Sequence, residues 1–228
     1  MPVTIQNRRA RQLFGPDCLF GITDFNGFMG NLAGNYATVT GTLAEVATPF
    51  GTGIQVGAAG SYVRFDWRAF APLTDAPRSI FARFLVPTSL APGPGSEQIL
   101  VSWGGVGADR DRFDAREQSG DVGYGPYNDG DTVGTGMPVT GNWSSVGVSN
   151  EGTNGGDNIV FLNGVVASGA NGAACVTTHT DLYLFTNSGN PGNNGAPENS
   201  ILQEVLVFNR ALSLAEMLHL HNKVTGAA

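Results

Sequence analysis

The chain has 228 residues, a formal net charge of −7 and 33 glycines, and only 14% of its residues are charged. This length suits one large domain with enough chain to bury a full core, and the acidic balance argues against nucleic acid as the main partner. No apolar stretch is long enough to span a bilayer, and residues 1–11 lack the apolar core of a secretory signal.

The N-terminal segment combines three arginines with an apolar pair: Arg8, Arg9, Arg11, Leu13 and Phe14. Terminal segments of this kind are usually solvated and poorly ordered. The alternative is an arm that docks on a partner through these five residues. The chain is therefore expected to consist of an N-terminal arm, residues 1–20, and a single domain over residues 21–228, with both interpretations of the arm left open.

The next part of the chain is rich in short apolar runs bounded by Gly, Pro, Asn and Asp, which is typical of strands and turns. Residues 21–60 predict two or three strands, and alternation over residues 62–67 predicts a half-buried strand. Residues 79–86 are apolar on nearly both faces, which predicts a central strand covered on both sides. Residues 98–103 predict another strand, and residues 104–142 one or two more.

The last third of the chain contains four further strand-like runs, at residues 143–149, 159–166, 181–185 and 201–208. Asn163 and Gly164 are the strongest turn signal of the chain, because a two-residue type I′ turn needs positive φ at both positions. Residues 186–200 form a long polar loop, a kind of segment that is usually functional or mobile. Ser213 and Glu216 have the spacing of a capping box, which predicts the start of a short helix.

These runs, in this order, resemble the second half of a laminin-G-like domain of the concanavalin A-like lectin/glucanase superfamily. The matching motifs are Trp-x-x-Val-x-Val at 143–148, Val-Phe-Leu-Asn-Gly at 160–164, Leu-Tyr-Leu at 182–184 and Glu-Val-x-Val-Phe-Asn-Arg-Ala-Leu-Ser at 204–213. The resemblance implies an all-β fold, a two-sheet antiparallel β-sandwich of jelly-roll type with one short C-terminal helix. Because this sandwich hosts unrelated activities, the resemblance indicates fold rather than function.

Catalytic motifs are missing from the sequence. The glucanases of this superfamily carry two carboxylates on one strand, as Glu-x-Asp-x-x-Glu, to flank a glycosidic bond. Asp109, Asp111 and Asp114 imitate this spacing, but arginines intervene and no aliphatic strand pattern surrounds them, so a solvated set of ion pairs is the favoured interpretation. A nucleophile elbow, zinc-type Cys/His spacing and a phosphate loop are also missing. The protein is therefore not expected to be an enzyme.

Metal binding and disulfide formation both have a simpler alternative. Residues 128–131 and 154–158 could supply oxygen ligands for Ca²⁺, which laminin-G-like domains often hold at the rim of the sandwich. Both segments are also ordinary turn sequences, the favoured interpretation, so no cofactor is predicted. Cys18 and Cys175 do not make a disulfide framework and are expected to be reduced.

Glycan binding usually needs an aromatic ring beside amide or carboxylate groups. The best such set in the sequence is Tyr124, Tyr127, Asn128 and Asp129. The competing interpretation is a tyrosine pair packed on the edge of the sandwich.

Three functions are compatible with these observations. The first is a structural phage virion component, a capsid decoration protein or a fibre or tail attachment protein, located in a virion assembled in a host cytoplasm. Its partners would be other virion proteins, and it would form a homo-oligomer or occur in many copies on a particle. The alternative is a lectin-like module that binds surface polysaccharide. The third, a glucanase-like hydrolase, is disfavoured by the missing carboxylate pair.

Overall fold

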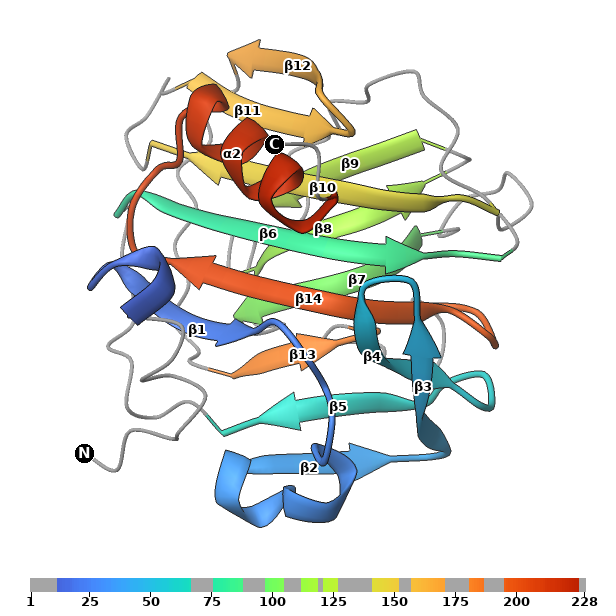
Figure 1. Ribbon diagram of the computed structural model, residues 1–228. Coiled ribbons are helices and arrows are strands. Elements are labelled where there is room, and N and C mark those ends of the chain that lie inside the picture. The colour runs from blue at the N-terminus through green and yellow to red at the C-terminus, as the bar shows by residue number, and fades with distance from the viewer. Residues whose placement is uncertain are drawn as a thin grey trace.

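The computed structural model describes residues 12–66, 76–87, 97–104, 112–118, 121–126, 141–151, 157–170, 181–186 and 195–225. These residues form two antiparallel β-sheets packed face to face, with a C-terminal helix lying on the outside of one sheet (Figure 1). The prediction of a two-sheet antiparallel sandwich with a short C-terminal helix is confirmed.

The first sheet has the strand order β12-β11-β10-β6-β14-β4-β3, and β1 also pairs with β14. Its strands are β1 (Cys18–Ile22), β3 (Leu43–Thr48), β4 (Gly51–Val56), β6 (Arg78–Leu85), β10 (Trp143–Asn150), β11 (Asp157–Leu162), β12 (Val165–Ala170) and β14 (Ile201–Phe208). Because β1 begins at Cys18, the predicted arm of residues 1–20 shares its last three residues with this sheet.

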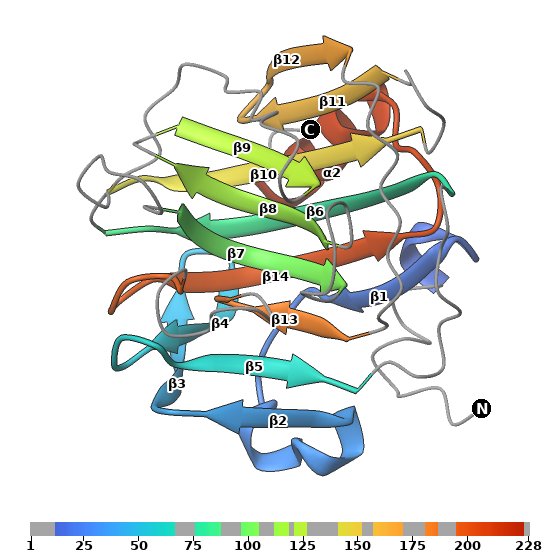
Figure 2. The same cartoon turned by 180° about the vertical axis from the view of Figure 1, so that it is seen from behind.

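The second sheet has the strand order β2-β5-β13-β7-β8-β9. Its strands are β2 (Ala37–Thr40), β5 (Tyr62–Phe65), β7 (Glu97–Gly104), β8 (Arg112–Gln118), β9 (Asp121–Pro126) and β13 (Leu182–Leu184). Figure 2 shows this sheet in front of the first. The 3₁₀ turns η1 (Met29–Asn31) and η2 (Ala33–Asn35) and the helix α2 (Leu214–Thr225) complete these elements.

The turn between β11 and β12 has the predicted geometry. Asn163 and Gly164 both have positive φ, 48° and 94°, and Leu162 lies opposite Val165 in the strand pairing. The two-residue type I′ hairpin is therefore confirmed.

Strand β8 contains the last residue of the charged set Asp109, Asp111 and Asp114. Residues 112–118 form a strand that pairs with β7 on one side and β9 on the other, in line with the one or two strands predicted within residues 104–142. Ala115 of this strand is fully buried. A strand that buries a small residue between charged ones shows no aliphatic pattern, which is why the sequence did not locate this strand within residues 104–142. Asp109 and Asp111 lie outside the described residues.

Strand β6 lies in the middle of the first sheet, and both of its faces are covered. Ile80, Ala82 and Phe84 belong to the core between the two sheets. Phe81 faces the other way and belongs to an outer cluster under α2, which consists of Cys18, Phe81, Phe161, Leu206, Phe208, Leu212, Met217 and Leu220. Burial on both faces explains the continuous apolar run, as predicted for this segment.

Helix α2 begins with the predicted capping box. The Ser213 N–H donates to Glu216 Oε2 at 2.9 Å, and the Glu216 N–H donates to Ser213 Oγ at 3.4 Å. Gly147 of β10 makes room for the helix, since a Cβ at this position would come within 2.8 Å of Met217 Sδ. In the described part of the chain, no helix combines the length and apolar character that crossing a membrane requires.

Cys18 is fully buried, and its thiol donates to the Phe20 carbonyl at 3.3 Å. Cys175 lies outside the described residues, so the expectation for the pair stays a prediction.

Candidate functional site

The aromatic platform predicted from the sequence falls largely outside the described residues. Tyr124 lies in β9, where it is the register partner of Ala115 in β8. The other three residues of the predicted platform are outside: Tyr127, Asn128 and Asp129. A different pair of tyrosines, on β5 and β13 of the same sheet, does come together beside charged groups.

Tyr62 of β5 and Tyr183 of β13 form an aromatic pair on the outer face of the six-stranded sheet. Their ring centroids are 6.2 Å apart and their planes meet at 49°. The neighbouring residues Val63 and Leu182 are fully buried in the core. Because side chains alternate along a strand, the two tyrosines point away from that core. Strands β5 and β13 lie side by side in Figure 2.

Arg64 is the register partner of Tyr183 and forms an ion pair beside the rings. Its Nε donates to Asp181 Oδ2 at 2.9 Å, and a terminal nitrogen lies 2.6 Å from the same oxygen. The side chains of Arg64 and Asp181 are 48% and 20% exposed, so a ligand in solution can reach them. We call Tyr62, Arg64, Asp181 and Tyr183 the tyrosine face.

The tyrosine face is a single electrostatic unit. The hydrogen bond to Asp181 raises the pKa of Arg64, and burial acts in the opposite direction. Burial also raises the pKa of Tyr183, with Asp181 and Tyr62 adding to the effect and Arg64 opposing it. At neutral pH the phenol of Tyr183 is therefore neutral, but the residue is only 9% exposed, so the more accessible groups of the face are the half-buried Tyr62, the charged guanidinium and its carboxylate.

A polar row continues from the tyrosine face onto β7. Ser102 is the register partner of Tyr183 on that strand. It is fully buried, and its hydroxyl finds no hydrogen-bond partner among the described residues. Buried hydroxyls are usually hydrogen-bonded, and within the described part of the chain this one stands out beside Tyr183.

Two of the five residues predicted to dock a partner are described, and they lie on the other side of the molecule. Leu13 is 46% exposed, and the half-buried Phe14 ring lies 4.7 Å from Lys223 Nζ of α2. The three arginines of this set lie outside the described residues: Arg8, Arg9 and Arg11. Of the predicted site residues that the structure describes, Leu13 and Phe14 thus lie beside the first sheet, and Tyr124 lies on β9 of the second.

Metal ligands are not gathered anywhere in the described ranges. No group of three or more His, Cys, Asp or Glu side chains within them is arranged to hold an ion. Residues 128–131 lie outside those ranges, as does most of 154–158, of which Asp157 and Asn158 belong to β11.

Sequence reasoning missed the tyrosine face because its members are distant in the chain. Arg64 and Asp181 are 117 positions apart, and the pairing of β5 with β13 alone makes them neighbours. A signal was present, since Tyr62 and Tyr183 occupy the outward positions of alternating strands. Nothing in the sequence indicated that these two strands pair.

No family model matches the sequence, and no curated protein matches it. Solved structures do match the fold. The binding domain of Paraclostridial Mosquitocidal Protein 1 has a TM-score of 0.63 at 14% identity, over 83% of this chain and 48% of that one. A structure titled for the dependence of botulinum neurotoxin type C cell entry on two ganglioside molecules has a TM-score of 0.59 at 13% identity, over 84% and 48%. Trypanosoma rangeli sialidase has a TM-score of 0.54 at 12% identity, over 84% and 29%.

This chain therefore spans about half the length of the two toxin structures and less than a third of the sialidase. At such low identity the likeness establishes the fold, a concanavalin A-like sandwich. It does not single out the laminin-G-like family that the sequence motifs resemble.

Proposed function

We propose that this protein is a non-catalytic, lectin-like module that binds carbohydrate through the tyrosine face. The observation that carries the proposal is the Tyr62–Tyr183 ring pair beside the Arg64–Asp181 ion pair on the outer face of a sheet. A sugar ring has an apolar C–H face and a rim of hydroxyls. Aromatic rings cover the first, and charged groups form strong hydrogen bonds with the second.

The fold likeness supports a binding role. The first of the matching structures is described as a binding domain, and the type C toxin is described as interacting with gangliosides. Because this chain spans about half of each, neither description assigns the ligand to the half that this chain resembles. The proposal therefore rests on the residues of the tyrosine face, with the fold as secondary support.

The proposed absence of catalysis rests on the sequence, which lacks the paired carboxylates of a glycosidase strand. In the tyrosine face, Asp181 is held by Arg64, which orients both groups for hydrogen bonding to hydroxyls. The hypothesis of a virion component stays a prediction from the sequence, since neither the fold nor the comparisons bear on it. The two hypotheses are compatible, because a particle protein can also grip glycans.

A glycan array followed by titration calorimetry tests the proposal. Wild-type protein should bind at least one glycan class, and Tyr62→Ala should weaken that binding by about tenfold or more, as loss of a central aromatic contact does. Tyr62→Phe keeps the ring and is the matched control, expected to bind within a few-fold of wild type. If Tyr62→Ala binds the glycan with unchanged affinity, the glycan site does not include Tyr62 and the proposal is wrong. Release of reducing sugar from a bound glycan would overturn the non-catalytic role.

A further inference from the structure

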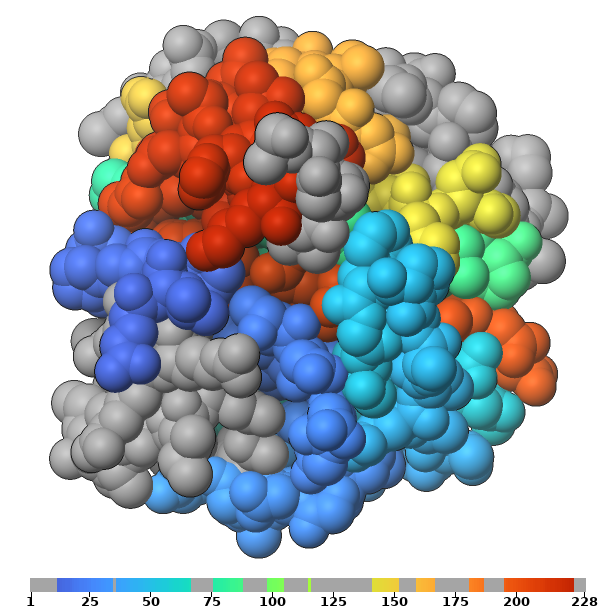
Figure 3. Space-filling view, in the orientation of Figure 1, coloured from blue at the N-terminus to red at the C-terminus, as the bar shows by residue number. Residues whose placement is uncertain are grey.

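A pocket of about 340 Å³ lies on the outer face of the first sheet, between the N-terminal residues and α2. Leu13 and Phe14 form one wall, and Ala215 of α2 lies on the other. In Figure 3 the N-terminal residues, in dark blue, lie beside the red helix. This site is on the opposite sheet from the tyrosine face and shares no residue with it.

The inner surface of the pocket is apolar. Phe208, Leu212 and Leu220 line it and are buried members of the outer cluster, against which Phe14 packs. Covering such surface with a ligand is favourable, by about 25 cal/mol for each Å² of apolar area removed from water. The pocket therefore suits a ligand with an apolar body.

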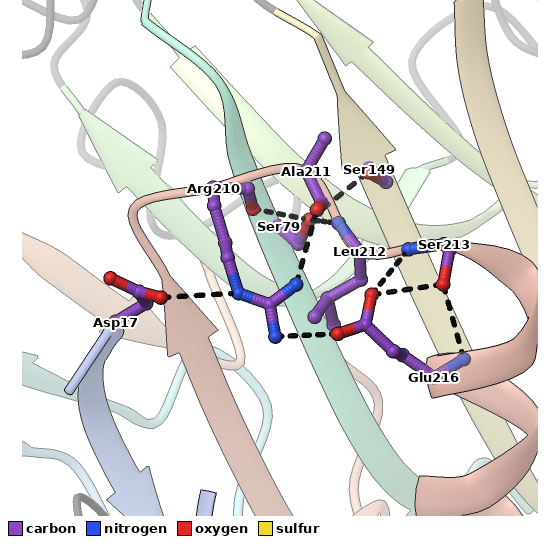
Figure 4. Close-up of polar contacts among 8 residues, drawn as sticks. All are labelled: Asp17, Ser79, Ser149, Arg210, Ala211, Leu212, Ser213 and Glu216. Atoms are coloured by element: carbon purple, nitrogen blue, oxygen red, sulfur yellow. Dashed lines mark hydrogen bonds and ion pairs between the residues drawn. The ribbon is translucent and has the colours of Figure 1, made fainter. Parts of the chain in front are cut away.

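Two of the charged groups in the wall neutralise each other. Arg210 lies 2.7 Å from Glu216 Oε1 through a terminal nitrogen and 3.5 Å from Asp17 Oδ2 through Nε (Figure 4). Another of its N–H groups donates to the Ala211 carbonyl at 3.4 Å. The Arg210 guanidinium therefore already has partners in Asp17, Ala211 and Glu216 (Figure 4). These contacts connect the end of β14 to α2.

Besides Arg210, the pocket is lined by one other permanently charged cation, Lys223. It is the only lysine of the sequence. Its ammonium lies 4.7 Å from the centroid of the Phe14 ring, a cation–π geometry that holds positive charge at the wall. Lys223 is exposed, so its N–H donors can meet a ligand. His219 also lines the pocket. In a chain with a net charge of −7, this wall is a local site for an anion.

We propose that this pocket binds a medium-chain fatty carboxylate, with the chain against Phe14, Phe208 and Leu212 and the carboxylate on Lys223. A volume of 340 Å³ corresponds to about eleven water molecules at about 30 Å³ each, which is room for a ligand of roughly ten non-hydrogen atoms. Octanoate has this size. The proposal does not depend on glycan binding.

The single lysine offers a direct probe. Reductive methylation with ¹³C-formaldehyde keeps the charge of Lys223 and gives it a dimethylamino NMR signal. The same reaction also labels the α-amino group of the chain. The two signals are distinguished with Lys223→Arg, which lacks the lysine signal. Titration with octanoate should shift the Lys223 signal saturably, and 1-octanol, which has no charge, should bind about tenfold or more weakly. An unsaturable response to octanoate, or equal affinity for octanol, would overturn the proposal.

A matched pair of variants on α2 locates the ligand. Ala215→Trp fills the pocket from its wall and should abolish octanoate binding. Leu214→Trp adds a large side chain at the neighbouring position, which is exposed and outside the pocket, and should bind as wild type. Octanoate binding by a folded Ala215→Trp protein would contradict the assignment.

A charge variant keeps the proposal testable if Ala215→Trp does not fold. Lys223→Gln, measured by calorimetry, should weaken octanoate about tenfold and leave octanol unchanged. Equal octanoate affinity in this variant and wild type would rule out the lysine as the carboxylate partner. Glycan binding should be unaffected in all four variants, so failure here is separate from failure of the proposed function.

Discussion

Arg83 of β6 and Glu204 of β14 are register partners, and each is only 2% exposed. The Arg83 guanidinium lies 4.5 Å from the centroid of the Phe50 ring and donates to the His221 carbonyl at 3.3 Å. Glu204 Oε2 and Arg83 Nε find no hydrogen-bond partner among the described residues. Burial raises the pKa of Glu204 to about 7, against the opposing effect of Arg83 and Lys223.

Glu204 should make the protein less stable as the pH rises. A carboxyl group whose pKa is raised by folding binds its proton more tightly in the folded state, so its contribution is fully present below the unfolded pKa of 4.5 and is lost as the pH rises through about 7. The shift corresponds to about 3 kcal/mol. Glu204→Gln should therefore unfold at higher urea than wild type at pH 8 and at similar urea at pH 5.

The control for this prediction is Glu151→Gln, which removes an exposed carboxylate and should leave the pH profile unchanged. If wild type and Glu204→Gln show the same change in unfolding free energy between the two pH values, the buried carboxyl does not govern it.

Glu216 should affect the stability of the fold at the acid end of the pH range. Its pKa is lowered to about 2, first by the hydrogen bond to Arg210 and further by Ser213. A lowered carboxyl pKa stabilises the fold above the unfolded pKa of 4.5, and this contribution is lost as the pH falls through about 2. The side chain is 42% exposed, so solvent screening limits the effect to about 1 kcal/mol.

Glu216→Gln should therefore lower the unfolding free energy at pH 7 and match wild type near pH 2. Asp17→Asn is the comparison, since its carboxylate lies 3.5 Å from the same arginine and should contribute less. A larger loss from Asp17→Asn than from Glu216→Gln would reverse the assigned roles.

Gly53 of β4 should not tolerate a side chain. A Cβ there would lie 2.9 Å from the Leu202 carbonyl oxygen and 2.8 Å from Ile201 Cγ2, and the backbone oxygen cannot move aside easily. Gly53→Ala should lower the unfolding free energy by about 1–3 kcal/mol, the cost of overpacking. Thermal unfolding against Gly30→Ala provides the test, because a Cβ at Gly30 meets nothing within 4 Å. Equal melting temperatures of the two variants would show that β4 can shift away from β14.

Arg64 should contribute to glycan affinity by charge and by geometry. Arg64→Gln removes the charge and should weaken binding of the glycan found on the array by about tenfold. Arg64→Lys keeps the charge without the planar fork of the guanidinium and should fall between wild type and Arg64→Gln in calorimetry. If wild type and the two variants bind the glycan with equal affinity, the ion pair with Asp181 stabilises the sheet and does not contribute to glycan binding.

Local signals in the sequence determined most of the fold. The turn at Asn163 and Gly164, the capping box at Ser213 and the apolar strand runs each depend on neighbours a few residues away. Their chemistry therefore specifies the structure before any long-range contact forms. For β8 the sequence predicted only that one or two strands lie within residues 104–142, because the position of this strand depends on pairing with β7 and β9 rather than on its own pattern.

The sites depend on which strands pair, and short-range patterns carry no information about that. Tyr62 meets Tyr183 because β13 lies between β5 and β7, and Phe14 meets Lys223 because β1 and α2 both pack at β14 and the outer cluster. The same residues on separate strands would be ordinary surface side chains. Strand order across each sheet is set by burial of the whole core, so only the tertiary structure decided where the residues of the two proposed sites come together.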